Sequence, residues 1–130
     1  MTIPFWCVLA ACVLPYIISG VGAYYRLKLP GGVDNKNPRQ QAARLEGTGA
    51  RAYAAQQNAW EALPIFIAAV CVAHLAGVPP EKATAPALVF IGARVGHLVA
   101  YLADQDKLRS LCWALGFGCC MALFGLAINT

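Results

Sequence analysis

Residues 3–25 read IPFWCVLAACVLPYIISGVGAYY and contain no acidic, basic or histidine side chain. A helix needs about 20 predominantly apolar residues to cross the hydrocarbon core of a bilayer, so this stretch is long enough to span a membrane. Residues 110–130, SLCWALGFGCCMALFGLAINT, also lack acids, bases and histidine. These two stretches predict the first and last spans of an integral membrane protein.

Two further apolar stretches lie between them. PIFIAAVCVAHLAGVPP follows Glu61 closely and continues backwards through AYAAQQNAWEAL, which predicts one long helix that is polar in its first half. ATAPALVFIGARVGHLVAYLA is apolar except for Arg94 and His97. We therefore expect an all-α integral membrane four-helix bundle that forms a single domain over residues 1–130. Its predicted spans are about 3–25, 50–77, 83–103 and 108–128.

The charges indicate how the bundle lies in the membrane. Only 12% of the residues are charged, about half the usage of a soluble domain. Eight of the ten basic residues fall in two of the three connections: Arg26, Lys28, Lys36, Arg39, Arg44 and Arg51, then Lys107 and Arg109. Cytoplasmic loops of membrane proteins carry such an excess, so both termini are predicted to be non-cytoplasmic. The net charge of +4 is thus a topology signal and predicts no nucleic-acid partner.

The six cysteines all lie within the apolar stretches: Cys7, Cys12, Cys71, Cys112, Cys119 and Cys120. They form no CxxC pair and no Cys/His spacing of the kind that binds a metal ion. We interpret them as small buried apolar side chains. No metal site is expected.

Two charged residues are predicted near the middle of the membrane. Glu61 lies ten residues after Arg51, and Arg94 lies nine residues before Ala103. At 1.5 Å per residue, both lie roughly 14 Å below the cytoplasmic ends of their helices. Charges at this depth are costly and tend to be functional. We therefore expect Glu61 and Arg94 to pair across neighbouring helices.

Other polar residues share the faces of these two. One helix face carries Arg51, Asn58 and Glu61, and another carries Arg94, His97 and Tyr101. We expect the two faces to form one pocket that opens towards the cytoplasm, with Arg26, Arg51 and Arg109 as a positively charged rim.

A purely structural ion pair is the simplest alternative for Glu61 and Arg94, since buried pairs can fix the register of helices. That alternative does not account for two polar faces, a basic rim and the hydroxyl of Ser110 beside Arg109. His74 stands alone on the apolar side of its helix, and we interpret it as a packing residue.

The same residues resemble a known family. Asn58-Ala59-Trp60-Glu61, with Arg51 seven residues earlier and Pro64 and Phe66 following, resembles the second helix of the MAPEG family. These are membrane-associated proteins in eicosanoid and glutathione metabolism. Residues 94–102, RVGHLVAYL, resemble the RVxHxVAYL segment of its prostaglandin E synthase and microsomal glutathione transferase branches. The match extends to Arg26-Leu27-Lys28 and to Arg109-Ser110.

The resemblance implies a homotrimer that binds glutathione as a co-substrate between subunits, while a lipophilic small molecule approaches from the lipid bilayer. It implies a glutathione-dependent transferase or peroxidase acting on small lipophilic electrophiles. Arg109 and Ser110 would be the catalytic residues that stabilise the thiolate. Glutathione would be bound by Arg26, Arg51, Asn58, Glu61, Arg94, His97 and Tyr101. The long first connection suggests a bacterial subgroup, which would place the protein in the inner membrane.

Three positions depart from the prostaglandin synthase branch, and they leave a second hypothesis open. Ala54 and Gln57 stand where that branch has arginines, and Trp113 stands where it has a tyrosine. A non-catalytic membrane binding or assembly subunit with the same fold is therefore the alternative function. A third hypothesis, a small proton-coupled multidrug exporter, is disfavoured because such exporters have a carboxylate in the first helix, and residues 3–25 contain none.

Overall fold

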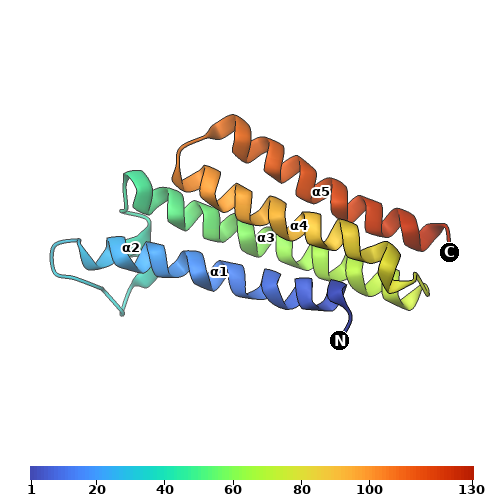
Figure 1. Ribbon diagram of the computed structural model, residues 1–130. Coiled ribbons are helices and arrows are strands. Elements are labelled where there is room, and N and C mark those ends of the chain that lie inside the picture. Colours follow the sequence, from blue (N-terminus) through green and yellow to red (C-terminus); the bar gives the residue numbers. More distant parts are fainter.

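A computed structural model describes all 130 residues as an all-helical bundle. It contains α1 (Ile3–Leu27), α2 (Pro38–Ala42), α3 (Gly47–Leu75), α4 (Pro80–Leu102) and α5 (Asp106–Ile128). The four long helices run side by side, and short α2 lies in the connection between α1 and α3 (Figure 1). Each long helix has the length and apolar composition to cross a membrane. The predicted fold class is confirmed.

The helix boundaries differ from the predicted spans by no more than three residues, and two of these differences have local causes. α3 begins at Gly47, before the predicted start, because Gly49 lets its first turn pack on α1. A Cβ atom at Gly49 would lie 3.0 Å from Tyr25 Cβ, so a larger residue does not fit. α4 begins at Pro80, since proline in the first turn needs no hydrogen-bond partner for its nitrogen.

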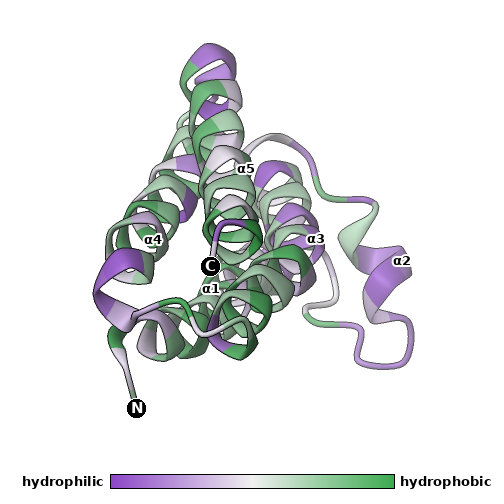
Figure 2. Cartoon of the chain, turned by 90° about the vertical axis from the view of Figure 1, so that its right-hand side faces the viewer, coloured by the Kyte–Doolittle hydropathy of each residue, from purple (hydrophilic) through white to green (hydrophobic).

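Most residues of the long helices are apolar, as Figure 2 shows by colour. Large hydrophobic side chains such as Trp6, Ile17 and Leu111 are more than half exposed on α1 and α5. The interior is built from small residues around a few large ones. Phe66 and Phe90 stack at 3.8 Å between ring centroids and join α3 to α4. This distribution fits a bundle surrounded by lipid.

A close approach of α4 and α5 depends on Gly96. A Cβ atom there would lie 3.0 Å from Cys112 Sγ, whereas Gly92 and Gly118 have open space beside them. Of the two glycines on α4, Gly96 therefore serves the packing of α4 on α5, whereas Gly92 has no neighbour within the chain. All six cysteine thiols are free.

The buried side chain of Gln41 holds the connection between α1 and α3 in place through three hydrogen bonds. Its Oε1 accepts hydrogen bonds from Arg26 Nε at 2.8 Å and from the Asp34 backbone N–H at 2.9 Å, and its Nε2 donates to Gly32 O at 2.7 Å. The Asp34 carboxylate accepts the backbone N–H of Asn37, which lowers the pKa of that carboxyl. One glutamine thus fixes the path of a connection that otherwise has little regular structure.

Both termini lie at one end of the bundle, and the α1–α3 connection and the α4–α5 turn lie at the other (Figure 1). We predict that a reporter active only in the cytoplasm is silent when fused after Thr130, because the basic residues concentrate at the opposite end. The same reporter inserted in the α1–α3 connection should be active. Strong activity of the C-terminal fusion would contradict the predicted orientation.

Candidate functional site

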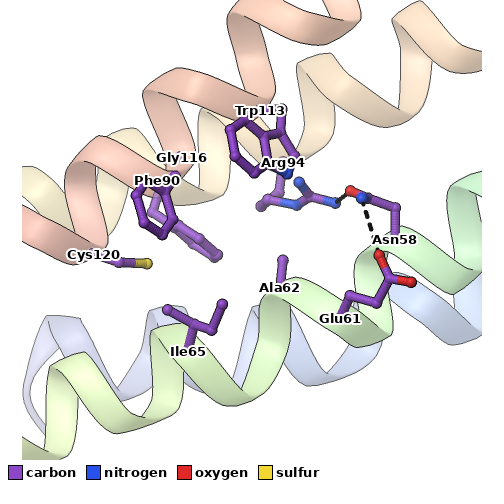
Figure 3. A pocket seen from close by; sticks show the side chains of 10 residues that line it. Asn58, Glu61, Ala62, Ile65, Phe90, Arg94, Trp113, Gly116 and Cys120 are labelled. Carbon is purple, nitrogen blue, oxygen red and sulfur yellow. Dashed lines mark hydrogen bonds between the residues drawn. The ribbon is translucent and has the colours of Figure 1, made fainter.

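Arg94, Asn58 and Glu61 form a short polar chain between α4 and α3 (Figure 3). Arg94 is only 3% exposed, and its Nη2 donates to Asn58 Oδ1 at 2.8 Å. Asn58 Nδ2 donates in turn to Glu61 Oε2 at 3.4 Å. The predicted direct pair of Glu61 and Arg94 is wrong, because Asn58 lies between the two charges and bonds to both.

Glu61 differs from Arg94 in that it is exposed in the single subunit. Its one hydrogen-bond partner is Asn58, although it lies near the middle of a helix that is apolar enough to span a membrane. An uncovered carboxylate at this depth is costly in lipid. We therefore expect a protein surface or a polar ligand to cover this face of α3.

An apolar hollow of about 200 Å³ lies beside this chain, between α3, α4 and α5. Its polar end is formed by the Arg94, Asn58 and Glu61 side chains, and its other end is apolar (Figure 3). It is lined by Asn58, Glu61, Ala62, Ile65, Phe90, Arg94, Trp113, Gly116, Phe117 and Cys120.

A second, polar hollow of about 220 Å³ adjoins it on the side of the α4–α5 turn. It is lined by Asn58, His97, Tyr101, Arg109, Ser110 and Trp113. Asn58 and Trp113 line both hollows, so they form the boundary between them. The structure thus brings together seven of the nine predicted site residues around the two hollows: Asn58, Glu61, Arg94, His97, Tyr101, Arg109 and Ser110.

Aromatic contacts hold Arg109 in the polar hollow. Its guanidinium carbon lies 4.5 Å from the centroid of the Tyr101 ring, a distance typical of a cation–π contact. The Tyr101 ring in turn meets His97 edge to face at 5.5 Å. His97 is 2% exposed, and its Nδ1 has no hydrogen-bond partner in the subunit. A buried polar atom without a partner is uncommon, and it leaves His97 free to bond a ligand.

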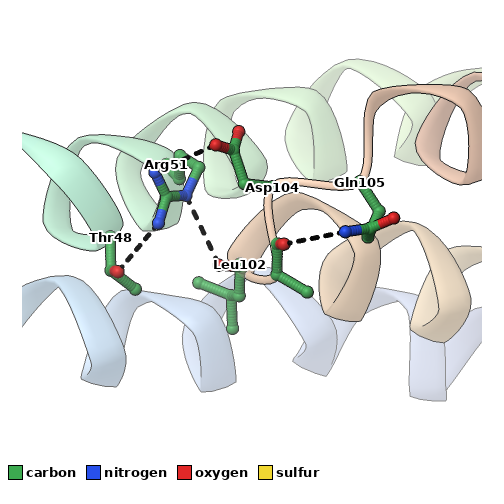
Figure 4. Close-up of polar contacts among 6 residues, drawn as sticks. Thr48, Arg51, Leu102, Asp104 and Gln105 are labelled. Atoms are coloured by element: carbon green, nitrogen blue, oxygen red, sulfur yellow. Dashed lines mark hydrogen bonds and ion pairs between the residues drawn. The ribbon is translucent and has the colours of Figure 1, made fainter.

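Arg51 lies outside both hollows and instead ties α3 to the α4–α5 turn (Figure 4). Its Nη2 donates to Thr48 Oγ1 at 2.9 Å, its Nε donates to Leu102 O at 3.4 Å, and its Nη1 lies 3.8 Å from Asp104 Oδ2. Asp104 has a φ of 58°, so the turn is tight and uses a left-handed residue. The structure therefore gives Arg51 internal partners in place of the predicted position on the rim.

Arg26 is also separate from the two hollows. It lines a third hollow of about 480 Å³ that lies between α1, α2 and α3, together with Arg39, Tyr53, Gln56 and Gln57. We call it the α1–α3 hollow. Within one subunit it lies on a different face of α3 from Asn58 and Glu61. The predicted rim of Arg26, Arg51 and Arg109 therefore does not form within one subunit.

We compared the amino-acid sequence with models of known protein families. The model of the MAPEG family matches residues 3–129. The chain belongs to the MAPEG family. The match covers nearly the whole chain, so the MAPEG assignment extends over all four long helices. No curated protein matches the sequence. This is accordingly an integral, multi-pass membrane protein of a family associated with glutathione and eicosanoid metabolism.

The apolar hollow of this MAPEG protein was not predicted from sequence. Phe90, Trp113 and Phe117 were interpreted as part of apolar spans, because aromatic side chains in such spans also pack against lipid. The spacing of Trp113 and Phe117 by four residues was the available signal, since it places both rings on one helix face. Their rings stack in the structure at 5.6 Å and 5°.

Proposed function

We propose that this MAPEG protein is a membrane-bound glutathione-dependent transferase or peroxidase that acts on small lipophilic electrophiles. One observation carries the proposal: Arg109 is held over the Tyr101 ring in a polar hollow, beside Ser110, and that hollow adjoins an apolar one. A hydrophilic thiol and a lipophilic acceptor need two such compartments in contact.

The chemistry requires a thiolate, because the thiol form is a weak nucleophile. A guanidinium beside the sulfur stabilises the negative charge, and a hydroxyl such as that of Ser110 can donate a hydrogen bond to it. In transfer, the sulfur forms a bond to the electrophilic carbon and the leaving group departs with its electron pair. His97 and Asn58, which both line the polar hollow, would bond the peptide groups of glutathione.

A site between subunits of a homotrimer explains two features of the single chain. Glu61 is exposed on the face that carries Asn58, and Arg26 lines a hollow on another face. In an assembly in which the α1–α3 hollow of one subunit lies against the polar hollow of the next, Arg26 reaches a glutathione carboxylate and Glu61 reaches the glutathione amine. Arg26 uses two of its five N–H donors within the subunit, so three remain for a ligand.

Calorimetric binding of glutathione to the detergent-purified protein tests this proposal. We expect the wild type to bind, and Arg26→Ala to raise the Kd about 10- to 100-fold, since a hydrogen bond to a charged group contributes about 1.5–3 kcal/mol. The thiol pKa of bound glutathione should not change, because Arg26 acts on a carboxylate. Arg44→Ala is the matched control: this arginine is exposed in the same connection, and its side chain makes no hydrogen bond or ion pair.

Equal loss of affinity in the Arg26 and Arg44 variants would contradict the intersubunit site, since it would indicate a general effect of charge. Absence of glutathione binding to the wild type would favour the alternative function, a non-catalytic binding or assembly subunit.

A further inference from the structure

The α1–α3 hollow has a positive charge that its own lining does not neutralise. The guanidinium groups of Arg26 and Arg39 line it, and no acidic side chain does. Arg39 is exposed, and its side chain makes no hydrogen bond in the chain. Arg26 is different, because its Nε donates to Gln41 Oε1 at 2.8 Å and its Nη2 donates to Asp34 O at 3.1 Å. The connection between α1 and α3 therefore fixes the direction of one of the two cations.

These two bonds leave a single edge of the Arg26 guanidinium for a ligand. A guanidinium binds an oxyanion through two parallel N–H bonds, either along its side, from Nε and Nη2, or at its end, from Nη1 and Nη2. Both nitrogens of the side edge already donate to protein. We propose that Gln41 is a positioning residue, which presents the end of Arg26 to the α1–α3 hollow and leaves its charge available to an oxyanion.

The amide of Gln41 suits this role because it is neutral and carries both a donor and an acceptor. Its Oε1 accepts from Arg26 Nε and from the Asp34 backbone N–H, while its Nε2 donates to Gly32 O at 2.7 Å. A carboxylate at this position would hold a second acceptor against Gly32 O and would form an ion pair with the guanidinium. Gln41 therefore orients Arg26 without neutralising it.

The inference rests on the proposed function for the identity of the oxyanion, which is a carboxylate of glutathione. It adds a role for a residue that does not touch the ligand. Gln41 is buried and does not line the α1–α3 hollow. Its influence on binding is therefore exerted through Arg26, and we expect it to change the affinity for glutathione without changing the thiol pKa of the bound ligand.

Calorimetric binding of glutathione to the Gln41→Glu variant tests the inference. We expect the Kd to rise about tenfold or more, because the new carboxylate competes with the ligand for the charge of Arg26. The ultraviolet absorbance of the bound thiolate, titrated against pH, should give the same thiol pKa as in the wild type. Gln40→Glu is the matched control: it adds the same charge at the adjacent residue, which is exposed and whose side chain makes no hydrogen bond.

Gln41→Met separates positioning of Arg26 from simple folding of the connection, and it replaces the glutamate variant if that protein does not fold. Methionine has a similar size but removes the acceptor that holds Arg26 Nε. We expect the Kd to rise about three- to tenfold in the otherwise wild-type chain. In the Arg26→Ala background the same change should cause no further loss, because no guanidinium is left to orient.

The inference is overturned if Gln40→Glu weakens binding as much as Gln41→Glu does. It is also overturned if the losses of Gln41→Met and Arg26→Ala multiply in the double variant, which would show a structural role that is independent of Arg26. In both cases the wild type still binds glutathione, so the proposed function stands. Absence of glutathione binding to the wild type would overturn both.

Discussion

Replacing Arg109 with alanine is expected to leave glutathione bound but to remove most of its activation. Arg109 is the cation held over Tyr101 in the polar hollow, and in the proposed site the carboxylates of glutathione would be bound elsewhere. Removing one donor that stabilises a developing or full negative charge typically costs about 10²–10³ in rate, and we expect a loss of that size in conjugation. The ultraviolet absorbance of the bound thiolate, titrated against pH, measures the activation directly.

The positive charge of Arg109 determines the direction in which its removal shifts the pKa of the bound thiol. A guanidinium favours the thiolate, so the pKa of the bound thiol is lower in the wild type than in the Arg109 variant. The variant therefore needs a higher pH for the same thiolate fraction, and the two rates approach each other as the pH rises. Tyr101→Leu should have a smaller effect of the same sign, because it loosens Arg109 without removing it. An unchanged thiol pKa in the alanine variant would assign activation to another residue.

Replacing Asn58 with leucine is expected to have the largest effect on stability. Arg94 is almost fully buried, and Asn58 Oδ1 is its one hydrogen-bond acceptor. Removing the neutral acceptor of a hydrogen bond from a buried charge costs about 1.5–3 kcal/mol, because the guanidinium is left without a partner. We expect a loss of this order in the free energy of unfolding, measured by circular dichroism during denaturation in mixed micelles.

A double-mutant cycle distinguishes this chain of contacts from a direct Glu61–Arg94 pair. Asn58→Leu with Arg94→Met removes the charge as well as its acceptor and should recover much of the stability. Glu61→Gln should cost far less, since Glu61 is exposed and is 3.4 Å from Asn58. A coupling of Glu61 to Arg94 as large as that of Asn58 to Arg94 would show that the two charges interact directly.

The long helices could be predicted because their signal is contained in single stretches of sequence. Residues 3–25 and 110–130 are apolar throughout, and any structure must cover them with lipid or protein. The short helix α2 and the buried Gln41 could not be predicted in this way. Gln41 is one of two adjacent glutamines in a polar connection, and only the fold shows which of them faces Arg26 and Gly32.

Sequence spacing predicted which polar residues share a helix face, but not the contacts that they make between helices. Helical spacing placed Asn58 with Glu61, and Arg94 with His97 and Tyr101, because those pairs lie on one helix each. Contacts between helices depend on how each helix is rotated about its axis, which sequence spacing does not give. Arg94 therefore reaches Asn58 before Glu61, and Arg51 bonds Leu102 and Asp104 of the α4–α5 turn.

The uncharged side chain of Gln41 has a consequence for the response of the protein to ionic strength. Dissolved salt screens exposed charges beyond about 8 Å at physiological concentration and weakens surface ion pairs. The pair of Arg51 with the exposed Asp104 carboxylate is of this kind, so it loosens as salt is added. The bonds of the neutral Gln41 amide join it to the Arg26 guanidinium and to two backbone groups; none of them pairs two opposite charges, so screening affects them less. The wall that α2 contributes to the α1–α3 hollow therefore keeps its shape in dilute and in concentrated salt alike.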